Sequence, residues 1–398
     1  MAASPRVRLA QLSAAGALAY CSYAMCRSPV LPLFARQLGA SPAVVGLVVA
    51  ASTLTGVVLK FPAGALSDVA GRRVVLLAGA VVFAALPWSY VMIAALGALA
   101  AARVVHGSAT ALFGPVAAAT LSDLAPPDQR GRWLSTYAAA QGAGQALGPV
   151  LAAALIVGTD FSQAFVVSAL LGTLAVTLLI EWPRSARRPT GHALWPQLRQ
   201  GIRAVAADVP VLITSLAQAG QFFVNGTLSA FLPLYAHESL GLSTANIGWL
   251  FGMQTAATLL ARPVFGALSD RIGRRPLIVA GLTLCAVCMA AIAHAHDFSV
   301  LLALTMVYGA GLALTTSATS AYVTDLTRRT QYGAAHGLFG TIYDIGDALG
   351  PICAGLLVAS AGYAIAFQLT GAVALTVAVL FGWASRRWEG PVAPYSAA

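Results

Sequence analysis

The sequence predicts an all-α membrane protein with twelve transmembrane helices in two pseudo-symmetric six-helix bundles. The chain of 398 residues is 59% hydrophobic and only 9% charged, which is too little charge to cover the surface of a soluble protein. Its apolar residues fall into repeated blocks of about 20, the length that a helix needs to cross a bilayer. A transmembrane β-barrel would show short alternating segments instead.

Charges, glycines and prolines separate these blocks and set the expected spans. In the first half we expect spans at 9–36, 42–64, 74–95, 97–122, 134–158 and 161–182. In the second half we expect them at 207–236, 243–266, 276–295, 298–322, 332–359 and 362–384. The basic start of the chain and the apolar run behind it are similar to a signal peptide. No cleavage site clearly ends this run, so we interpret it as an uncleaved first helix.

The loop arginines predict how the chain crosses the membrane. Almost all of them lie at the two termini, in the middle linker and in the loops after the even-numbered spans, whereas the opposite loops hold only Arg36. Both termini are therefore expected in the cytoplasm. Topology and attraction to anionic lipid explain the net charge of +10, so nucleic-acid binding is not expected. The preference for Arg over Lys and the abundance of Ala suggest a GC-rich bacterial source, hence a multi-pass protein of the bacterial inner (cytoplasmic) membrane.

The chain contains an internal repeat. FPAGALSDVAGRR at 61–73 matches PVFGALSDRIGRR at 263–275, an offset of 202 residues, and the same offset relates Asp123 to Asp325. A parallel duplication of six spans places a site between the halves near mid-membrane, and rocking of the halves exposes that site to each side in turn. The sequence thus predicts a secondary transporter and no enzyme. No P-loop pattern suggests ATP hydrolysis.

The repeat also predicts the domain boundaries. We expect a six-helix bundle at 1–182, a cytoplasmic linker at 183–206 and a second six-helix bundle at 207–398. Within the linker, HALWPQLRQGIRAV places apolar residues on one helical face and arginines on another. This pattern predicts an amphipathic helix on the membrane surface.

The two copies of the motif, GALSDVAGRR and GALSDRIGRR, make the chain resemble the major facilitator superfamily over nearly its full length, in particular its drug/proton antiporter-like bacterial members. In that family the element acts as a conformational latch on the cytoplasmic side. The resemblance implies this role for Gly64, Asp68, Gly71, Arg72, Arg73, Gly266, Asp270, Arg271, Gly273 and Arg274. The last glycine of each copy permits a tight turn. The first copy departs from the pattern, with Val69 in the place of Arg271.

Two further motifs carry the resemblance. RVVHG, with Arg103 and His106, resembles the Arg-x-x-Gln-Gly motif that the family links to proton coupling. An intramembrane arginine is either functional or a structural strut, and His106 is expected to replace the Gln as a hydrogen-bonding group, although histidine can titrate near neutral pH. GQALGP at 144–149 resembles the Gly-x-x-x-Gly-Pro motif of the antiporters, and GDALGP repeats it in the second half.

Asp344 and Asp347 lie in the middle of the eleventh span. At a spacing of i, i+3 they share one helix face. Two carboxylates on a dry face cannot both ionise cheaply, so we expect them to bind a proton. The alternative is that one of them caps or hydrogen-bonds a bent backbone near Pro351. Arg27 is expected deep in the first span, where it either binds an anionic substrate group or pairs with one of these aspartates.

The remaining candidates are polar residues in the spans, any one of which could equally be an interhelical hydrogen bond. The expected substrate-binding set is Arg27, Tyr20, Tyr23, Gln141, Gln145, Gln221, Asn225 and Tyr343. The five cysteines lie in apolar stretches and are expected to pack rather than to bind metal. No cofactor, metal or disulfide is expected.

These observations favour one function over another. We expect proton-coupled efflux of a small organic molecule, with protons, the substrate and the lipid bilayer as partners, by a monomer. The alternative is an organic-anion uniporter or symporter in which Arg27 clamps the anion.

Overall fold

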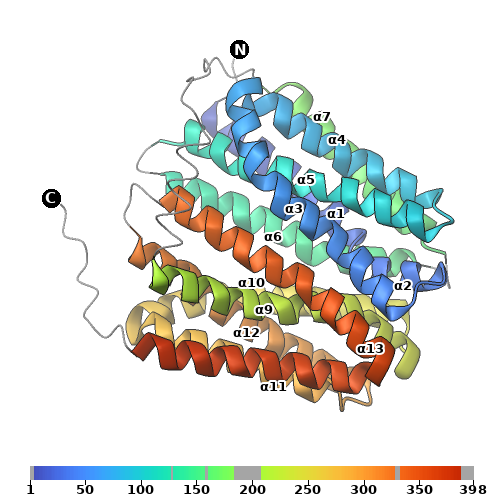
Figure 1. Cartoon of the computed structure of the whole chain (residues 1–398). Coiled ribbons are helices and arrows are strands. Elements are labelled where there is room, and N and C mark those ends of the chain that lie inside the picture. Colours follow the sequence, from blue (N-terminus) through green and yellow to red (C-terminus); the bar gives the residue numbers. More distant parts are fainter. Residues whose placement is uncertain (1–3, 127–128, 157–159, 183–207, 328–331, 387–398) are drawn as a thin grey trace. The chain divides into compact units, whose positions relative to one another are not determined.

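The computed structural model describes residues 4–126, 129–156, 160–182, 208–327 and 332–386, whose regular elements are helices (Figure 1). The helices of the first half are α1 Pro5–Met25, α2 Val30–Gln37, α3 Pro42–Ala70, α4 Arg72–Val91, α5 Leu96–Leu124, α6 Arg130–Leu155 and α7 Ser162–Ile180. Those of the second half are α9 Val209–Leu234, the π-helix η1 Tyr235–Ser239, α10 Thr244–Ile272, α11 Arg274–Ile292, α12 Phe298–Leu326 and α13 Tyr332–Ser385. The amphipathic helix predicted in the linker lies outside the described residues.

The described helices follow the predicted spans in order and confirm the all-α fold class. α13 covers two predicted spans, which meet at Gly362. This residue adopts a φ of 83° and interrupts the helix there, as only glycine does readily. Among the described residues, seven helices are by themselves long and apolar enough to cross a membrane.

The first predicted span is not one continuous helix. α1 ends at Met25 and α2 begins at Val30, with Pro29 at the break. Proline has no backbone N–H to donate and restricts the residue before it, so the interruption has a local cause. Arg27 lies within this break, which the continuous span expected from hydropathy did not anticipate.

The latch motifs form helix ends rather than loops. α3 continues to Ala70 and α10 to Ile272, beyond the predicted ends at 64 and 266. A single glycine separates each helix from the next, with a φ of 92° at Gly71 and 93° at Gly273. The predicted tight turns are therefore confirmed. The spans were predicted too short because the polar motif ends the hydrophobic run before it ends the helix.

The described residues group into two compact units. The first unit holds the first half of the chain together with Ser229–Thr255, and the second unit holds the rest of the second half. In the first unit α1 packs against α6 and α7, α3 against α5, and α4 against α5 and α7. Its core includes Tyr20, Phe83 and Phe113. In the second unit α11 packs against α12 and α13.

The same helix crossing occurs in both units. A Cβ built on Gly144 of α6 would lie 2.1 Å from the carbonyl oxygen of Ala17 in α1. A Cβ on Gly346 of α13 would lie 2.1 Å from the carbonyl oxygen of Ala219 in α9. Both pairs obey the offset of 202 residues. Glycine is thus required at each crossing, since the backbones touch there.

Candidate transport and coupling site

Arg103 lies at the centre of a buried polar cluster in the first unit. α5 places its side chain, which has no exposed surface, against α1 and α3. Its Nη2 donates to the Ser52 hydroxyl, which also accepts a hydrogen bond of 3.1 Å from the Tyr23 hydroxyl. The guanidinium lies 5.7 Å from the centroid of the Tyr23 ring, within the range of a cation–π interaction. The predicted residues Arg103 and Tyr23 are therefore neighbours.

His106, one turn further along α5, belongs to the same cluster. Its Nδ1 lies 2.8 Å from the hydroxyl oxygen of Tyr90 in α4, and its ring meets that of Tyr23 edge-on at 5.0 Å. The imidazole is fully buried. His106 thus makes a hydrogen bond, as expected for a residue in the place of the Gln, and the bond fixes the ring orientation.

The cluster leaves some polar atoms without a partner. The Nε and Nη1 atoms of Arg103 and the Nε2 atom of His106 are buried and make no hydrogen bond in the described part of the chain. Buried polar groups nearly always find partners, so such exceptions need an explanation. No carboxylate of a described residue contacts Arg103 to neutralise its charge.

The second unit holds the two aspartates on α13. Asp344 and Asp347 are both buried, with 8% and 5% of their surface exposed. Asp347 accepts a hydrogen bond of 3.2 Å from the Asn225 amide of α9. A Cβ on Gly226 would lie 2.3 Å from the Asp347 carbonyl oxygen, so the glycine brings α9 close enough for this bond. The structure thus joins two predicted residues, Asn225 and Asp347.

Tyr343 and Gln221, two other predicted residues of the second unit, make different contacts. The Tyr343 ring packs on Phe222, with centroids 4.6 Å apart. Gln221 is fully buried and accepts hydrogen bonds from Gln218, at 3.0 Å, and from Thr316, at 3.4 Å. These contacts favour a structural role for Gln221, since an interhelical hydrogen bond accounts for its burial.

The remaining predicted substrate residues lie in the first unit. Tyr20 is buried against Phe83 and Phe113, which makes it a core residue as much as a candidate for binding. Gln141 is half-buried and Gln145 is exposed, both on α6, and Arg27 is half-buried in the break between α1 and α2. Arg27 lies within electrostatic range of Arg103 and Tyr23, and Tyr20 packs on Phe83, whose ring also contacts those of Tyr23 and His106.

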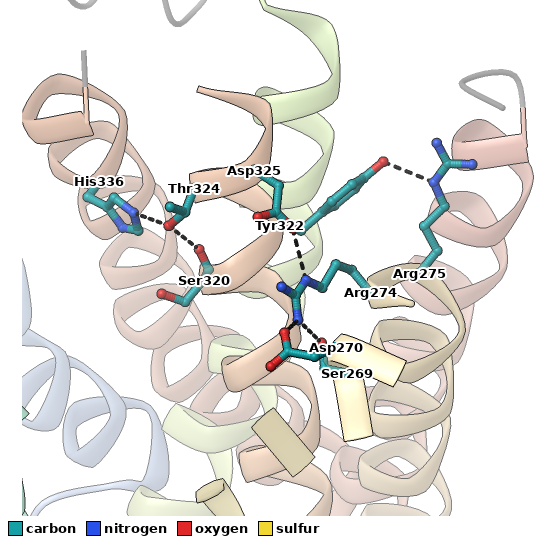
Figure 2. A network of polar contacts seen from close by, with 9 residues as sticks. All are labelled: Ser269, Asp270, Arg274, Arg275, Ser320, Tyr322, Thr324, Asp325 and His336. Carbon is teal, nitrogen blue, oxygen red and sulfur yellow. Dashed lines mark hydrogen bonds and ion pairs between the residues drawn. The ribbon is translucent and has the colours of Figure 1, made fainter. Parts of the chain in front are cut away.

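The second latch motif forms a network that ties three helices together (Figure 2). Arg274, at the start of α11, donates to Asp325 of α12 at 2.9 Å and to Asp270 and Ser269 of α10 at 2.5 and 2.8 Å. The next residue, Arg275, donates to the Tyr322 hydroxyl at 2.9 Å. The planar guanidinium of Arg274 suits this role, because it presents several N–H groups in a fixed fork. Arg271 is exposed at the end of α10.

The first latch motif repeats this geometry. Arg72 lies 3.4 Å from Asp123 and donates to the Ser67 hydroxyl, while Arg73 donates to the Ile180 carbonyl oxygen. Nothing is described of the surroundings of Gly64 or of the side chain of Asp68. Asp123 and Asp325, which the offset of 202 residues relates, form equivalent ion pairs with Arg72 and Arg274.

The partners that complete the Arg103 cluster, Ser52 and Tyr90, could not be identified from the sequence. Each lies in a largely apolar span beside other hydroxyl residues, Thr53 and Thr55 in one and Ser89 in the other. Their signal is weak, because hydroxyl groups in a span are common and the partner of each lies on another helix. No group of three or more metal-ligating side chains occurs in the part of the chain that the structure describes.

Comparison with known proteins identifies the family of this chain. A family model described as Major Facilitator Superfamily matches residues 12–245 and 214–397. Quinolone resistance protein NorA of Staphylococcus aureus is 24% identical, over 83% of this chain and 84% of that protein. Multidrug resistance protein MdtG of Citrobacter koseri is 24% identical, over 90% of each chain. The fold resembles the crystal structure of a bacterial homolog of the human lysosomal transporter Spinster, with a TM-score of 0.80, 16% identity and coverage of 96% of this chain and 97% of that one. The chain therefore belongs to the Major Facilitator Superfamily and is a multi-pass membrane transporter, not an enzyme.

Proposed function

We propose that the chain exports a small organic molecule in exchange for protons, by alternating access, in a bacterial inner membrane with both termini in the cytoplasm. The observation that carries the proposal is the pair of buried carboxylates, Asp344 and Asp347, one turn apart on α13. A carboxylate buried at membrane depth must either bind a proton or find a partner. A pair of them on one face favours sharing a proton, which can then be exchanged for substrate.

The Asn225 contact supports Asp347 as the proton carrier. The Asn225 amide nitrogen donates to Asp347 Oδ1, which gives this carboxylate a polar neighbour on α9 inside the protein. Asp344 lies one turn earlier on the same helix. The names of the relatives NorA and MdtG, a quinolone and a multidrug resistance protein, support drug-like substrates.

Reconstituted vesicles with an imposed pH gradient test this proposal. Ethidium, followed by its fluorescence, serves as the probe. We expect Asp344→Asn and Asp347→Asn each to abolish the gradient-driven part of ethidium transport while the purified protein remains monodisperse. Asp297→Asn is the matched control, because Asp297 is an exposed acid that caps α12, and it is expected to transport normally. Normal gradient-driven transport by both α13 variants would refute the assignment.

The second candidate is transport of an organic anion with Arg27 as the clamp. The specific observation in its favour is the break between α1 and α2, where Arg27 is half-buried. Interrupted helices in transporters commonly line the substrate site, since irregular backbone is tolerated where it faces a cavity. A radiolabelled benzoate uptake assay separates the two candidates. The clamp predicts that Arg27→Ala abolishes uptake and that Arg27→Lys, which lacks the planar fork, restores it only in part. Uptake that is indifferent to Arg27→Ala would remove this candidate.

A further inference from the structure

The loops that follow the first and the seventh spans are copies of one another. QLGAS at 37–41 matches SLGLS at 239–243 with the offset of 202 residues. The glycine of each copy has a positive φ, 85° at Gly39 and 64° at Gly241. The serine of each copy accepts a hydrogen bond from the backbone N–H three residues later. Both loops lie at the outer ends of their helices, by which we mean the ends opposite the GRR turns.

The helices before these loops differ by one residue. LPLFA at 31–35 matches LPLYA at 232–236 with an offset of 201, not 202. The π-helix at Tyr235–Ser239 supplies the additional residue. A π-turn is a one-residue insertion that rotates the side chains behind it, and such insertions occur frequently at functional sites. With the insertion, the residue equivalent to Arg36 is Glu238. Without it, the offset of 201 would make His237 the equivalent residue.

Arg36 and Glu238 form an ion pair. Arg36 Nε lies 2.8 Å from Glu238 Oε1, and the two side chains are 36% and 31% exposed. Arg36 Nη1 also donates to the Ala40 carbonyl oxygen at 2.7 Å. That bond holds the guanidinium over its own loop, aimed at the copy of the loop that follows the seventh span. Residues at equivalent positions of the two repeats thus carry opposite charges and meet.

Close packing continues from this pair into the membrane, all of it within the first compact unit. The Ser28 hydroxyl donates to the Ser229 carbonyl oxygen at 2.9 Å. On the next helix, α10, a Cβ at Gly248 would lie 2.2 Å from Ala153 Cβ of α6. A Cβ at Gly252 would lie 2.1 Å from a Val150 methyl group. Helices from both repeats are therefore closely packed against one another at their outer ends.

We propose that the Arg36–Glu238 pair is the lock of an outer gate, which closes this end of the transport path and must break before the path opens there. The ion pair is half-exposed, so its own contribution is small and shifts the balance between closed and open gate about twofold to fivefold. A shift of this size is useful in a transporter, because a gate that must open in every cycle cannot be held shut strongly. The glycine contacts on α10 and α6 supply the close fit, and the pair determines how often that fit is broken.

The repeat gives the pair a specific property. Because the two residues occupy equivalent positions, exchanging their charges should rebuild the lock. In Glu238→Arg, the new guanidinium could donate to the Leu242 carbonyl oxygen. This is the equivalent of the bond that Arg36 makes to the Ala40 carbonyl oxygen. The Leu242 oxygen is reachable from this loop, since it lies 3.4 Å from His237 Nδ1. A salt bridge with no equivalent surroundings on its two sides would not tolerate the exchange.

Pulsed electron paramagnetic resonance on the full chain tests the lock without any substrate. Spin labels are placed at Gln37 and Ser239, two exposed residues at equivalent positions beside the pair, in a background in which the native cysteines are replaced. We expect Arg36→Glu and Glu238→Arg each to raise the long-distance population about twofold to fivefold. The double exchange should return the distribution to that of the parent. Arg36→Lys should stay close to the parent, because it keeps the charge.

Asp160→Asn is the matched control. Asp160 is exposed and follows α6 at the same outer end, and its hydrogen bonds from Ser162 hold the pKa of its carboxyl below the usual value, so the substitution removes a real charge. We expect no change in the distribution. Unaltered distances in both single exchanges, or a double exchange that fails to restore the parent, would overturn the proposal. The lock rests on alternating access as proposed above but not on proton coupling, which the α13 variants test separately.

Discussion

The two halves of the chain share a scaffold but differ in the charges that they bury. Gly144 on Ala17 and Gly346 on Ala219 are equivalent contacts of equal closeness. The chemistry around them is not repeated. The offset of 202 pairs Arg103 and His106 with Thr305 and Tyr308, and it pairs Asp344 and Asp347 with Gly142 and Gln145. The first half buries the cation Arg103, and the second half buries the two acids. The repeated residues therefore describe the fold, and the residues that break the repeat are where function should be sought.

The largest expected effect comes from breaking the shared scaffold. Gly144→Ala and Gly346→Ala each place a methyl group against a backbone carbonyl 2.1 Å away, and the helices must separate to admit it. We expect each to lower stability by about 1–3 kcal/mol, as overpacking does, and to do so to a similar extent in both halves. The midpoint of thermal unfolding in detergent, followed by tryptophan fluorescence, measures the effect.

Gly131→Ala is the control for this comparison. Gly131 also lies on α6, but a Cβ there meets nothing within 4 Å, so alanine should be neutral or stabilise through its higher helix propensity. A large difference between the two crossing glycines would show that the halves do not carry equal packing loads. The idea of a shared scaffold would then have to be abandoned.

The second prediction sharpens the difference in chemistry. Arg103→Lys keeps the charge but loses the planar fork that reaches Ser52, so we expect ethidium transport to fall at least tenfold, consistent with loss of about 1.5–3 kcal/mol from a charged hydrogen bond. Thr305→Val, at the equivalent position, removes only a bond to the carbonyl of Leu302 in its own helix. We expect transport to change less than about twofold. Initial rates in reconstituted vesicles distinguish the two. Equal effects would mean that Arg103 is a strut and that the asymmetry has no role in transport.

The sequence predicted the fold better than it predicted the site. Hydropathy and the repeat were enough to place the helices in order, because both depend on local composition. The break before Val30 and the helical ends at Ala70 and Ile272 were missed, since they depend on backbone geometry rather than on hydropathy. For the site, Arg103 and the α13 aspartates stood out as charges in apolar segments. Their partners, such as Ser52, did not, because a contact between distant helices leaves no mark on either segment alone.

The smallest expected effect separates the two latches. Arg274 pairs with Asp325 at 2.9 Å, whereas Arg72 approaches the equivalent Asp123 at the longer distance of 3.4 Å. Partly exposed ion pairs contribute about 0.2–1 kcal/mol each. Arg274→Gln should therefore destabilise the protein by up to about 1 kcal/mol through the loss of its pair with Asp325, and Arg72→Gln, whose pair with Asp123 is longer, by less.

Thermal unfolding in low salt measures this difference, and repeating it in high salt provides the control. Screening weakens exposed ion pairs, so the gap between Arg274→Gln and Arg72→Gln should narrow as salt is added. Arg271→Gln supplies a second control, because Arg271 is exposed at the same helix end, and we expect it to change stability by less than about 0.5 kcal/mol. If Arg72→Gln proved the more damaging variant, the latch of the first half would be the stronger one despite its longer ion pair. The length of the ion pair to the neighbouring helix would then not be what sets the strength of each latch.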